Sequence, residues 1–355
     1  MNRVIRWVGI FALILLPELW IVSAEPPALE LPDVRVGRSR LAFNNGEHNA
    51  FTDLTWFQGH IYLTFRSCPD GHMVFPTSRI LVMKSTDGKK WDLVHEFSVK
   101  NRDTRDPHFA ILNDTLFIYT GTWYCGPNKS PERNLNQMVG YGVSTRDGVA
   151  WSAPSILEGT YGHYVWRTAT FGDRIYMCAR RIRGFQEVRS VAKRAPLMRS
   201  LILVSDDGAH FQPAGVFQET HGDETAFMFD SEGNVTAVGR RGRGNAELIR
   251  LSPSLKVTER VDLGRYIGGP FIRSMGDHII VAGRNVRNDK PVTTVCWLIK
   301  NSLVDLCILP SGGDCSYPAM VQLCPGCMLV SYYSSHETDE NGVVQTNIYF
   351  VELEY

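Results

Sequence analysis

The sequence predicts an all-β fold, a six-bladed β-propeller built from four-stranded antiparallel blades. Two repeats carry this prediction. A β-hairpin pattern recurs six times along the 355 residues, and a short turn motif, [ST]-x-D-G-x-x-[WF], recurs between the hairpins. No long apolar run at helical spacing competes with these patterns. Six four-stranded units placed around one axis form a β-propeller.

The first element in chain order is a targeting segment. MNRVIRW is basic, VGIFALILL is apolar, and VSA before Glu25 has the small-residue spacing of a signal-peptidase site. We therefore expect a signal peptide over residues 1–24, a secreted or periplasmic protein, and a propeller domain over residues 25–355. An uncleaved anchor is the alternative, because PELWIV lengthens the apolar stretch.

The six hairpins share one pattern. Each has a polar or special residue, an apolar strand, a turn rich in Gly, Asp or Asn, and a second strand that ends on a polar residue. The repeats begin at Phe51, Arg105, Trp166, Glu224, Gly268 and Tyr317.

Three Asp-Gly turns lie between the first hairpins. They read STDGKKW, TRDGVAW and SDDGAHF, at residues 85–91, 145–151 and 205–211, and an apolar strand precedes each. Such a turn closes a second hairpin, onto which we expect the aromatic residue to pack back. Each unit therefore contains four strands. At the two ends of the domain, LPDVRVG is a candidate to pair with the C-terminal strand pattern and close the ring.

Composition limits the partners. Lysines and arginines number 37, as do aspartates and glutamates, and no polybasic run stands out, which argues against nucleic acid and a membrane surface. We expect a monomer that acts on a glycan or a glycoconjugate. The eight cysteines fit an oxidising compartment, and Cys296 and Cys307 could bridge neighbouring strands. CPGC is a lone C-x-x-C, so we expect neither a metal nor a cofactor.

Strand order locates the site. In an up-and-down blade, the start of strand 1 and the end of strand 2 lie at the end opposite the Asp-Gly turns, nearest the axis. Carboxylates, arginines and tyrosines collected in one funnel suit acid–base and nucleophilic chemistry and the binding of an anionic group. The strand starts supply Asp53, Arg105, Asp106, Trp166, Arg167, Glu224, Pro270 and Tyr317, and the strand ends supply Arg66, Arg180, Arg240, Arg284 and Tyr332.

From residue 44 to the C-terminus, the chain resembles the sialidase (neuraminidase) superfamily of six-bladed propellers. The hallmark of that family is the Asp-box, S-x-D-x-G-x-x-W, and the three turns here are one residue shorter. The resemblance implies a secreted exo-α-sialidase-like glycoside hydrolase.

The resemblance also implies roles for individual residues. CSYPAM is similar to the segment around the nucleophilic tyrosine, which assigns that role to Tyr317. DETAFMFDSEGNVTAVGRR is similar to the segment that holds the activating glutamate and a triad arginine, which assigns Glu224 and Arg240. Arg284, with Arg287 as a substitute, lies near the place of the last triad arginine.

One departure from the family pattern points to altered sugar specificity, and the general acid has two candidates. FTDL puts Asp53 close to the place of the first triad arginine, where an aspartate would repel a substrate carboxylate and Arg66 would have to compensate. The general acid is either Asp70, with His72 beside it, or Asp106.

Two other functions stay open. Five-bladed arabinanase-like glycosidases use three carboxylates, a role that Asp53, Asp106 and Glu224 could fill, although six repeats and the Asp-Gly turns argue against that family. The second alternative is a propeller that binds a glycan or a protein without catalysis.

Overall fold

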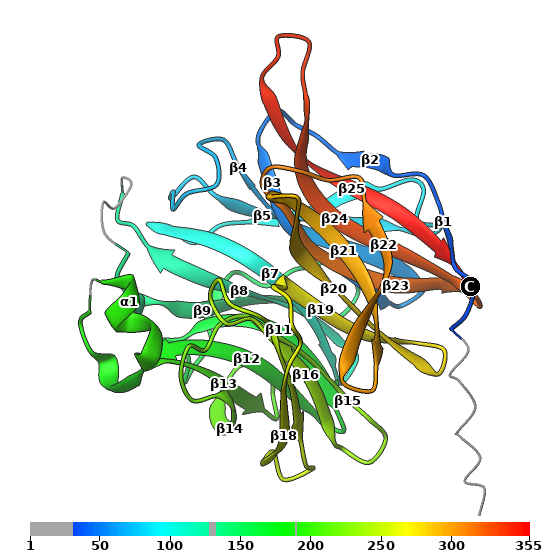
Figure 1. Ribbon diagram of the computed structural model, residues 1–355. Coiled ribbons are helices and arrows are strands. Elements are labelled where there is room, and N and C mark those ends of the chain that lie inside the picture. The colour runs from blue at the N-terminus through cyan, green and yellow to red at the C-terminus, as the bar shows by residue number, and fades with distance from the viewer. Residues whose placement is uncertain (1–30, 128–132, 189) are drawn as a thin grey trace, which may run out of the picture. The chain divides into compact units, whose positions relative to one another are not determined.

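The computed structural model describes residues 31–127, 133–188 and 190–355, so the predicted signal peptide lies outside the described residues. The stretch Val34–Tyr355 forms one compact unit composed mainly of β-strands (Figure 1). Within the described part of the chain, no helix has both the length and the apolar character needed to cross a membrane.

In the described residues, four sheets have four strands each, and every strand pairs antiparallel with its neighbour in the chain. This is the meander that the sequence predicts for a blade. The strands are β7 (Arg102–Leu112), β8 (Thr115–Tyr124), β9 (Val139–Thr145) and β10 (Ser155–Ile156); β11 (Tyr164–Phe171), β12 (Arg174–Ile182), β13 (Met198–Ser205) and β14 (Gln212–Gln218); β15 (Thr225–Phe229), β16 (Val235–Gly239), β17 (Glu247–Leu251) and β18 (Val257–Asp262); and β19 (Gly268–Met275), β20 (His278–Arg287), β21 (Lys290–Ile299) and β22 (Ser302–Leu309).

The other nine strands form one sheet. A single parallel pair, Thr346 with His48, joins its two halves. Four blades are therefore distinct and the fold is an all-β propeller, whereas the count of six stays a prediction. The nine strands are β1 (Arg35–Val36), β2 (Arg40–Phe43), β3 (His48–Phe57), β4 (His60–Cys68), β5 (Arg79–Ser85), β6 (Asp92–Phe97), β23 (Cys315–Cys324), β24 (Cys327–Thr338) and β25 (Val344–Glu354).

The six predicted hairpins all form, as β3–β4, β7–β8, β11–β12, β15–β16, β19–β20 and β23–β24. Short helices occur only in connections between strands of the described chain. They are η1 (Leu135–Gln137), η2 (Arg183–Phe185), α1 (Val191–Arg194) and η3 (Ala195–Leu197).

The Asp-Gly turns connect the third and fourth strands of their sheets and share one hydrogen-bond pattern. In the first, Asp87 Oδ1 accepts from the backbone amides of Lys89 and Lys90, and Ser85 Oγ accepts from that of Gly88. Ser85 pairs with Ile61, next to the β3–β4 turn, so the Asp-Gly turn lies at the far end of the strands from the predicted site.

The aromatic residues of these turns also contact strands outside their own hairpins. Trp91 Nε1 donates to the Gly88 carbonyl of its own turn, as expected, and its ring stacks on Phe350 of β25, with ring centroids 5.0 Å apart. Trp151 stacks on His95 of β6 at 4.8 Å. Trp91 therefore connects the two halves of the nine-stranded sheet, and Trp151 connects two neighbouring sheets.

The N-terminal strands complete the sheet around β25. β1 pairs antiparallel with β25, which confirms the predicted role of LPDVRVG, and β2 pairs with β25 farther along (Figure 1). The eight cysteines are free, so the predicted bridge between Cys296 and Cys307 is absent. Burial raises the pKa of the Cys307 thiol to about 12.

Candidate active site

Irregularities in the first strands of five hairpins build the site. The pairing register of β3, β7, β11, β19 and β23 shifts by one residue near the strand start, because two residues of the first strand lie opposite one residue of its partner. Such β-bulges bend a strand and redirect a side chain. Four of the residues inside these bulges have positive φ angles, namely Phe51 (65°), Asp106 (51°), Gly269 (56°) and Tyr317 (50°).

Tyr317 and Glu224 form the central pair. The Tyr317 hydroxyl donates to Glu224 Oε1 at 2.6 Å, and both side chains are buried. Two donors hold the other carboxylate oxygen, Oε2: Arg240 Nη1 at 2.9 Å and the Gly269 amide at 3.2 Å. The carboxylate therefore has a fixed orientation toward the phenol, as the sequence predicted for these two residues.

The proton of this pair lies on the phenol. Burial, and then the charge of Glu224, raise the pKa of Tyr317 well above its ordinary value. Burial also acts to raise the pKa of Glu224, but Arg240 and Arg180 outweigh burial and lower it to about 2. Glu224 is thus an ionised acceptor that can take the phenolic proton when the tyrosine oxygen reacts.

A second acidic residue completes the arginine cluster. Asp223 forms ion pairs with Arg180 and, at 3.4 Å, with Arg240. Asp223 was missed by sequence reasoning, although it directly precedes Glu224. Arg180 and Arg240 keep 20% and 22% of their side chains exposed, so neither side chain is fully enclosed.

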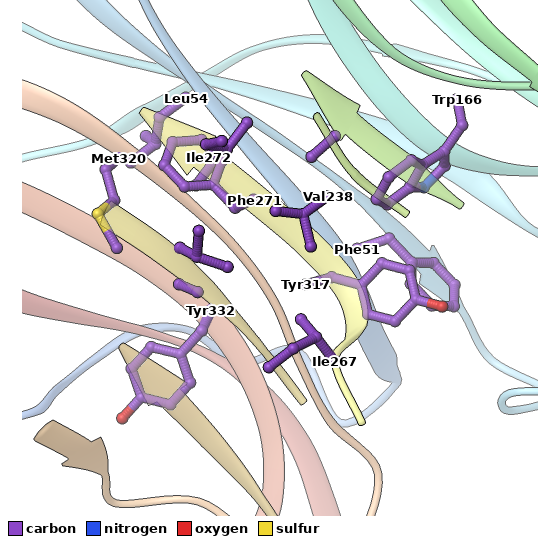
Figure 2. Packing of buried hydrophobic residues seen from close by; sticks show 14 of the residues in the cluster. Phe51, Leu54, Trp166, Val238, Ile267, Phe271, Ile272, Tyr317, Met320 and Tyr332 are labelled. Atoms are coloured by element: carbon purple, nitrogen blue, oxygen red, sulfur yellow. The ribbon is translucent and has the colours of Figure 1, made fainter. Parts of the chain in front are cut away.

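Aromatic rings enclose Tyr317. The Phe51 ring lies 4.9 Å away and the Trp166 ring 6.2 Å away, both edge-on (Figure 2). Gly269 packs against the face of the Tyr317 ring. A Cβ atom at this position would lie 2.5 Å from Tyr317 Cδ2, so only glycine fits here. The tyrosine is therefore held on three sides.

Asp106 is a site carboxyl whose pKa is raised. Burial and the repulsion from Glu224 raise its pKa to about 6. Its Oδ2 accepts a hydrogen bond from the Tyr164 hydroxyl, and its Oδ1 has no hydrogen-bond partner among the described residues. A protonated Asp106 could therefore donate to a substrate oxygen.

Arg66 and Arg105 bind a buried aspartate. Both pair with Asp103, at 3.0 and 2.6 Å, and both also donate to the Met73 carbonyl. Arg66 is fully buried in its ion pair with Asp103. It therefore does not take the place of the first triad arginine, as the sequence analysis required of it. These arginines hold the loop after β4.

Arg167 and Asp53 form a second buried ion pair, at 3.2 Å. Arg167 also donates to the carbonyls of Pro270 and Pro318, so it ties together the bulges of β19 and β23. Asp53 accepts from the Phe109 amide as well, and it lines a cavity of about 180 Å³ with Arg167. Asp53 is therefore engaged in structural contacts.

Arg284 belongs to a cluster around Asp314. Its Nη2 donates to Asp314 Oδ1 and to the Tyr333 hydroxyl, each at 2.9 Å. The other carboxylate oxygen, Oδ2, bonds His48 Nε2 at 2.9 Å and His72 Nδ1 at 2.6 Å. Of these residues, the sequence predicted Arg284 and His72, but not Asp314, His48 or Tyr333.

The second site tyrosine is Tyr333, not Tyr332. The Tyr333 ring lies 5.9 Å from the Tyr317 ring. Tyr332 points to the other side of β24, where its hydroxyl bonds Ser39 and the Pro310 carbonyl, and Figure 2 shows it apart from Tyr317. Adjacent strand residues face opposite sides of a sheet, so an error of one residue inverts the assignment.

Asp70 lies in the loop after β4, where its carboxylate accepts from the Thr77 hydroxyl at 2.5 Å. Among the described residues, no hydrogen bond or ion pair links Asp70 to Tyr317 or Glu224, so Asp106 is the better placed of the two candidate acids. The signal that would have revealed the bulges is the proline that follows each positive-φ residue in RDP, GGP and SYP, since proline within sheets is confined largely to edges and bulges.

Comparison with protein-family models found no match, and no curated protein matches the sequence. Solved structures do match. A Dyadobacter fermentans protein of unknown function is 19% identical, with a TM-score of 0.74, over 91% of this chain and 100% of that chain. Trypanosoma rangeli sialidase in complex with the inhibitor DANA is 12% identical, with a TM-score of 0.62, over 86% of this chain and 55% of that chain.

Phage phi92 endosialidase is 10% identical, with a TM-score of 0.67, over 90% of this chain and 69% of that chain. This chain thus spans about half the length of the Trypanosoma rangeli enzyme. At these identities the likeness shows a sialidase-like propeller fold.

Proposed function

We propose that this protein is a glycoside hydrolase of the sialidase type, which removes a terminal sugar from a glycan or glycoconjugate. The observation that carries the proposal is the 2.6 Å hydrogen bond from the Tyr317 hydroxyl to a Glu224 carboxylate held by Arg240 and the Gly269 amide. A neutral phenol with an adjacent base suits attack on an anomeric centre that carries negative charge nearby.

In this mechanism the Tyr317 oxygen bonds to the anomeric carbon while its proton passes to Glu224 Oε1. The bond to the leaving oxygen breaks, and Asp106 supplies the proton that this oxygen needs. Water then attacks the same carbon and gives a proton to the Asp106 carboxylate, the glycosyl–tyrosine bond breaks, and the proton on Glu224 returns to the phenolic oxygen. A Trypanosoma rangeli sialidase structure contains 2,3-difluorosialic acid as a covalent intermediate, which supports a covalent route on a related fold.

The proposed sugar is anionic. Arg240 and Arg284 each keep 22% of their side chains exposed, whereas Arg66, Arg105 and Arg167 are buried in ion pairs. Guanidinium groups bind carboxylates in a bidentate manner.

Three finer points belong to the same proposal. The nine-stranded sheet consists of two blades, because a single β-ladder pair connects its halves, and the ring then has six blades. The turns at residues 85–91, 145–151 and 205–211 are shortened Asp-boxes. The chain is exported after removal of residues 1–24 and acts as a monomer.

A panel of chromogenic glycosides, sialosides included, tests the activity. Tyr317→Phe and Glu224→Gln should each lower kcat by about a thousandfold or more, and the double variant should lose little beyond either single variant. Tyr332→Phe is the matched control, since its hydroxyl bonds Ser39 outside the site. Full turnover in Tyr317→Phe would refute the assignment. Glycan binding without any turnover would favour the non-catalytic alternative.

A further inference from the structure

We propose that His48, His72 and Asp314 bind a divalent transition-metal ion of the zinc class next to Tyr317. The three side chains come from the start of β3, the loop after β4 and the residue before β23. Their ligand atoms all lie within 4.8 Å of one another, and this is the one group of three such residues in the described chain. Imidazole nitrogens with a carboxylate oxygen form a common donor set for such ions.

Two of the three distances are close to those of a metal site. Two ligand atoms that each lie ~2.1 Å from a metal are ~3.0 Å apart at a right angle and ~3.4 Å apart at a tetrahedral angle. His48 Nε2 and His72 Nδ1 lie 2.9 and 2.6 Å from Asp314 Oδ2. The two histidine nitrogens lie within 4.8 Å of each other, so the imidazoles would have to move toward each other for all three atoms to bind one ion.

The surroundings already orient the carboxylate. Arg284 and Tyr333 both hold Asp314 Oδ1 at 2.9 Å, which leaves Oδ2 directed at the two histidines. Outer contacts of this kind position ligands in metal sites. The His72 side chain is 44% exposed, so an ion has a path from solvent.

The charge balance indicates what the ion would do. A divalent ion beside one carboxylate and one guanidinium leaves two uncompensated positive charges, and three protein ligands leave coordination positions open. The Phe51 ring contacts both His72, at 5.8 Å, and Tyr317, at 4.9 Å, which puts the cluster beside the nucleophile. An anionic sugar oxygen would fill an open position. This last step rests on the proposed function, whereas metal binding does not.

Metal binding can be measured without a substrate. Protein treated with a chelator and dialysed should bind one Zn²⁺ per chain in calorimetric titration, and Co²⁺ should give visible absorption bands in the same ratio. His72→Ala should weaken Zn²⁺ binding at least tenfold, and its exposure makes loss of folding a small concern. Asp314→Asn should do the same in protein shown to be folded by circular dichroism.

His210→Ala is the matched control, because His210 also bonds an aspartate, Asp207, at 2.7 Å, but on an exposed turn outside the cluster. It should bind Zn²⁺ like the unaltered protein. Absence of saturable binding at millimolar Zn²⁺, or equal binding by the His72→Ala protein, would overturn the metal site and show that the cluster is a hydrogen-bond network. Either result leaves the test of Tyr317 and Glu224 unaffected.

Discussion

Tyr317 occupies a backbone conformation that costs energy. Its φ angle of 50° and that of Ser316, 100°, lie in the left-handed region, which costs a non-glycine residue roughly 1–2 kcal/mol. The hydrogen bond from Thr52 Oγ1 to the Tyr317 carbonyl, at 2.9 Å, helps to hold this conformation. The strained backbone directs the phenol at Glu224.

The raised pKa of Asp106 predicts that the stability of the protein depends on pH. The pKa of Asp106 is raised to about 6 in the folded protein, so its neutral form stabilises the fold. That contribution is complete below the unfolded value of about 3.8 and is lost as pH rises through about 6, which amounts to about 3 kcal/mol. Urea unfolding between pH 4 and pH 7.5 should therefore show the native protein losing most of this stability relative to Asp106→Asn. Parallel profiles would contradict the raised pKa.

At the scale of elements, the bulges convert a plain meander into a site. Without them, alternate residues of each first strand would face the neighbouring sheets, and Asp106 and Tyr317 would not turn toward the axis. Arg167 reinforces the arrangement by binding carbonyls of two bulges, those of Pro270 and Pro318.

Substitution of Gly269 tests the packing around the Tyr317 ring. In Gly269→Ala, the new methyl group would overlap the Tyr317 ring, at 2.5 Å from Cδ2, and the φ angle of 56° adds strain. Gly242→Ala has the same φ of 56° and open space around it, so it isolates the strain alone. We expect Gly269→Ala to lose about 1–3 kcal/mol more than Gly242→Ala in urea unfolding, and most of its activity. Equal losses would mean that the Tyr317 ring has room to move.

The sequence predicts the elements better than the contacts between them. The six hairpins and the Asp-Gly turns depend on residues close in the chain, so alternation and turn residues suffice to find them. The Tyr317–Glu224 pair was predictable because both residues begin inner strands. Tyr333 was missed because the sequence analysis chose its neighbour Tyr332, and adjacent residues of a strand face opposite sides of the sheet.

Other site residues were missed, or given the wrong role, because their partners could not be seen in the sequence. Asp103 and Asp314 belong to buried or partly buried ion pairs, in which Arg66 and Arg284 are partners that lie far away in the sequence. His48, His72 and Asp314 have no spacing typical of a metal site, and only the fold brings them together. The sequence predicted that Arg66 and Arg167 bind substrate. In the structure both side chains are buried in ion pairs with aspartates.

At the scale of the whole molecule, the N-terminal strands contribute to stability. β1 and β2 cover the outer edge of β25, and the Phe43 ring contacts Phe65 of β4 at 4.9 Å, so this segment also joins the two halves of the nine-stranded sheet. An uncovered edge would favour aggregation.

A chain that begins at Asn44 should therefore melt at a lower temperature than one that begins at Glu25, and it should aggregate on heating. A chain that begins at Asp33 is the control, because it keeps both strands. Differential scanning calorimetry with light scattering measures both effects. Equal melting temperatures for all three chains would show that the edge strands add nothing.

The central claim is that Tyr317 forms a bond to the sugar. Incubation with fluorinated glycosyl fluorides, 2,3-difluorosialic acid among them, followed by peptide mass spectrometry, tests it most directly. We predict one label per chain, on the peptide that contains Tyr317, and no label in Tyr317→Phe. A label on Asp53 or Asp106, or turnover with inversion of configuration and no label, would contradict the claim and favour a mechanism that uses carboxylates alone.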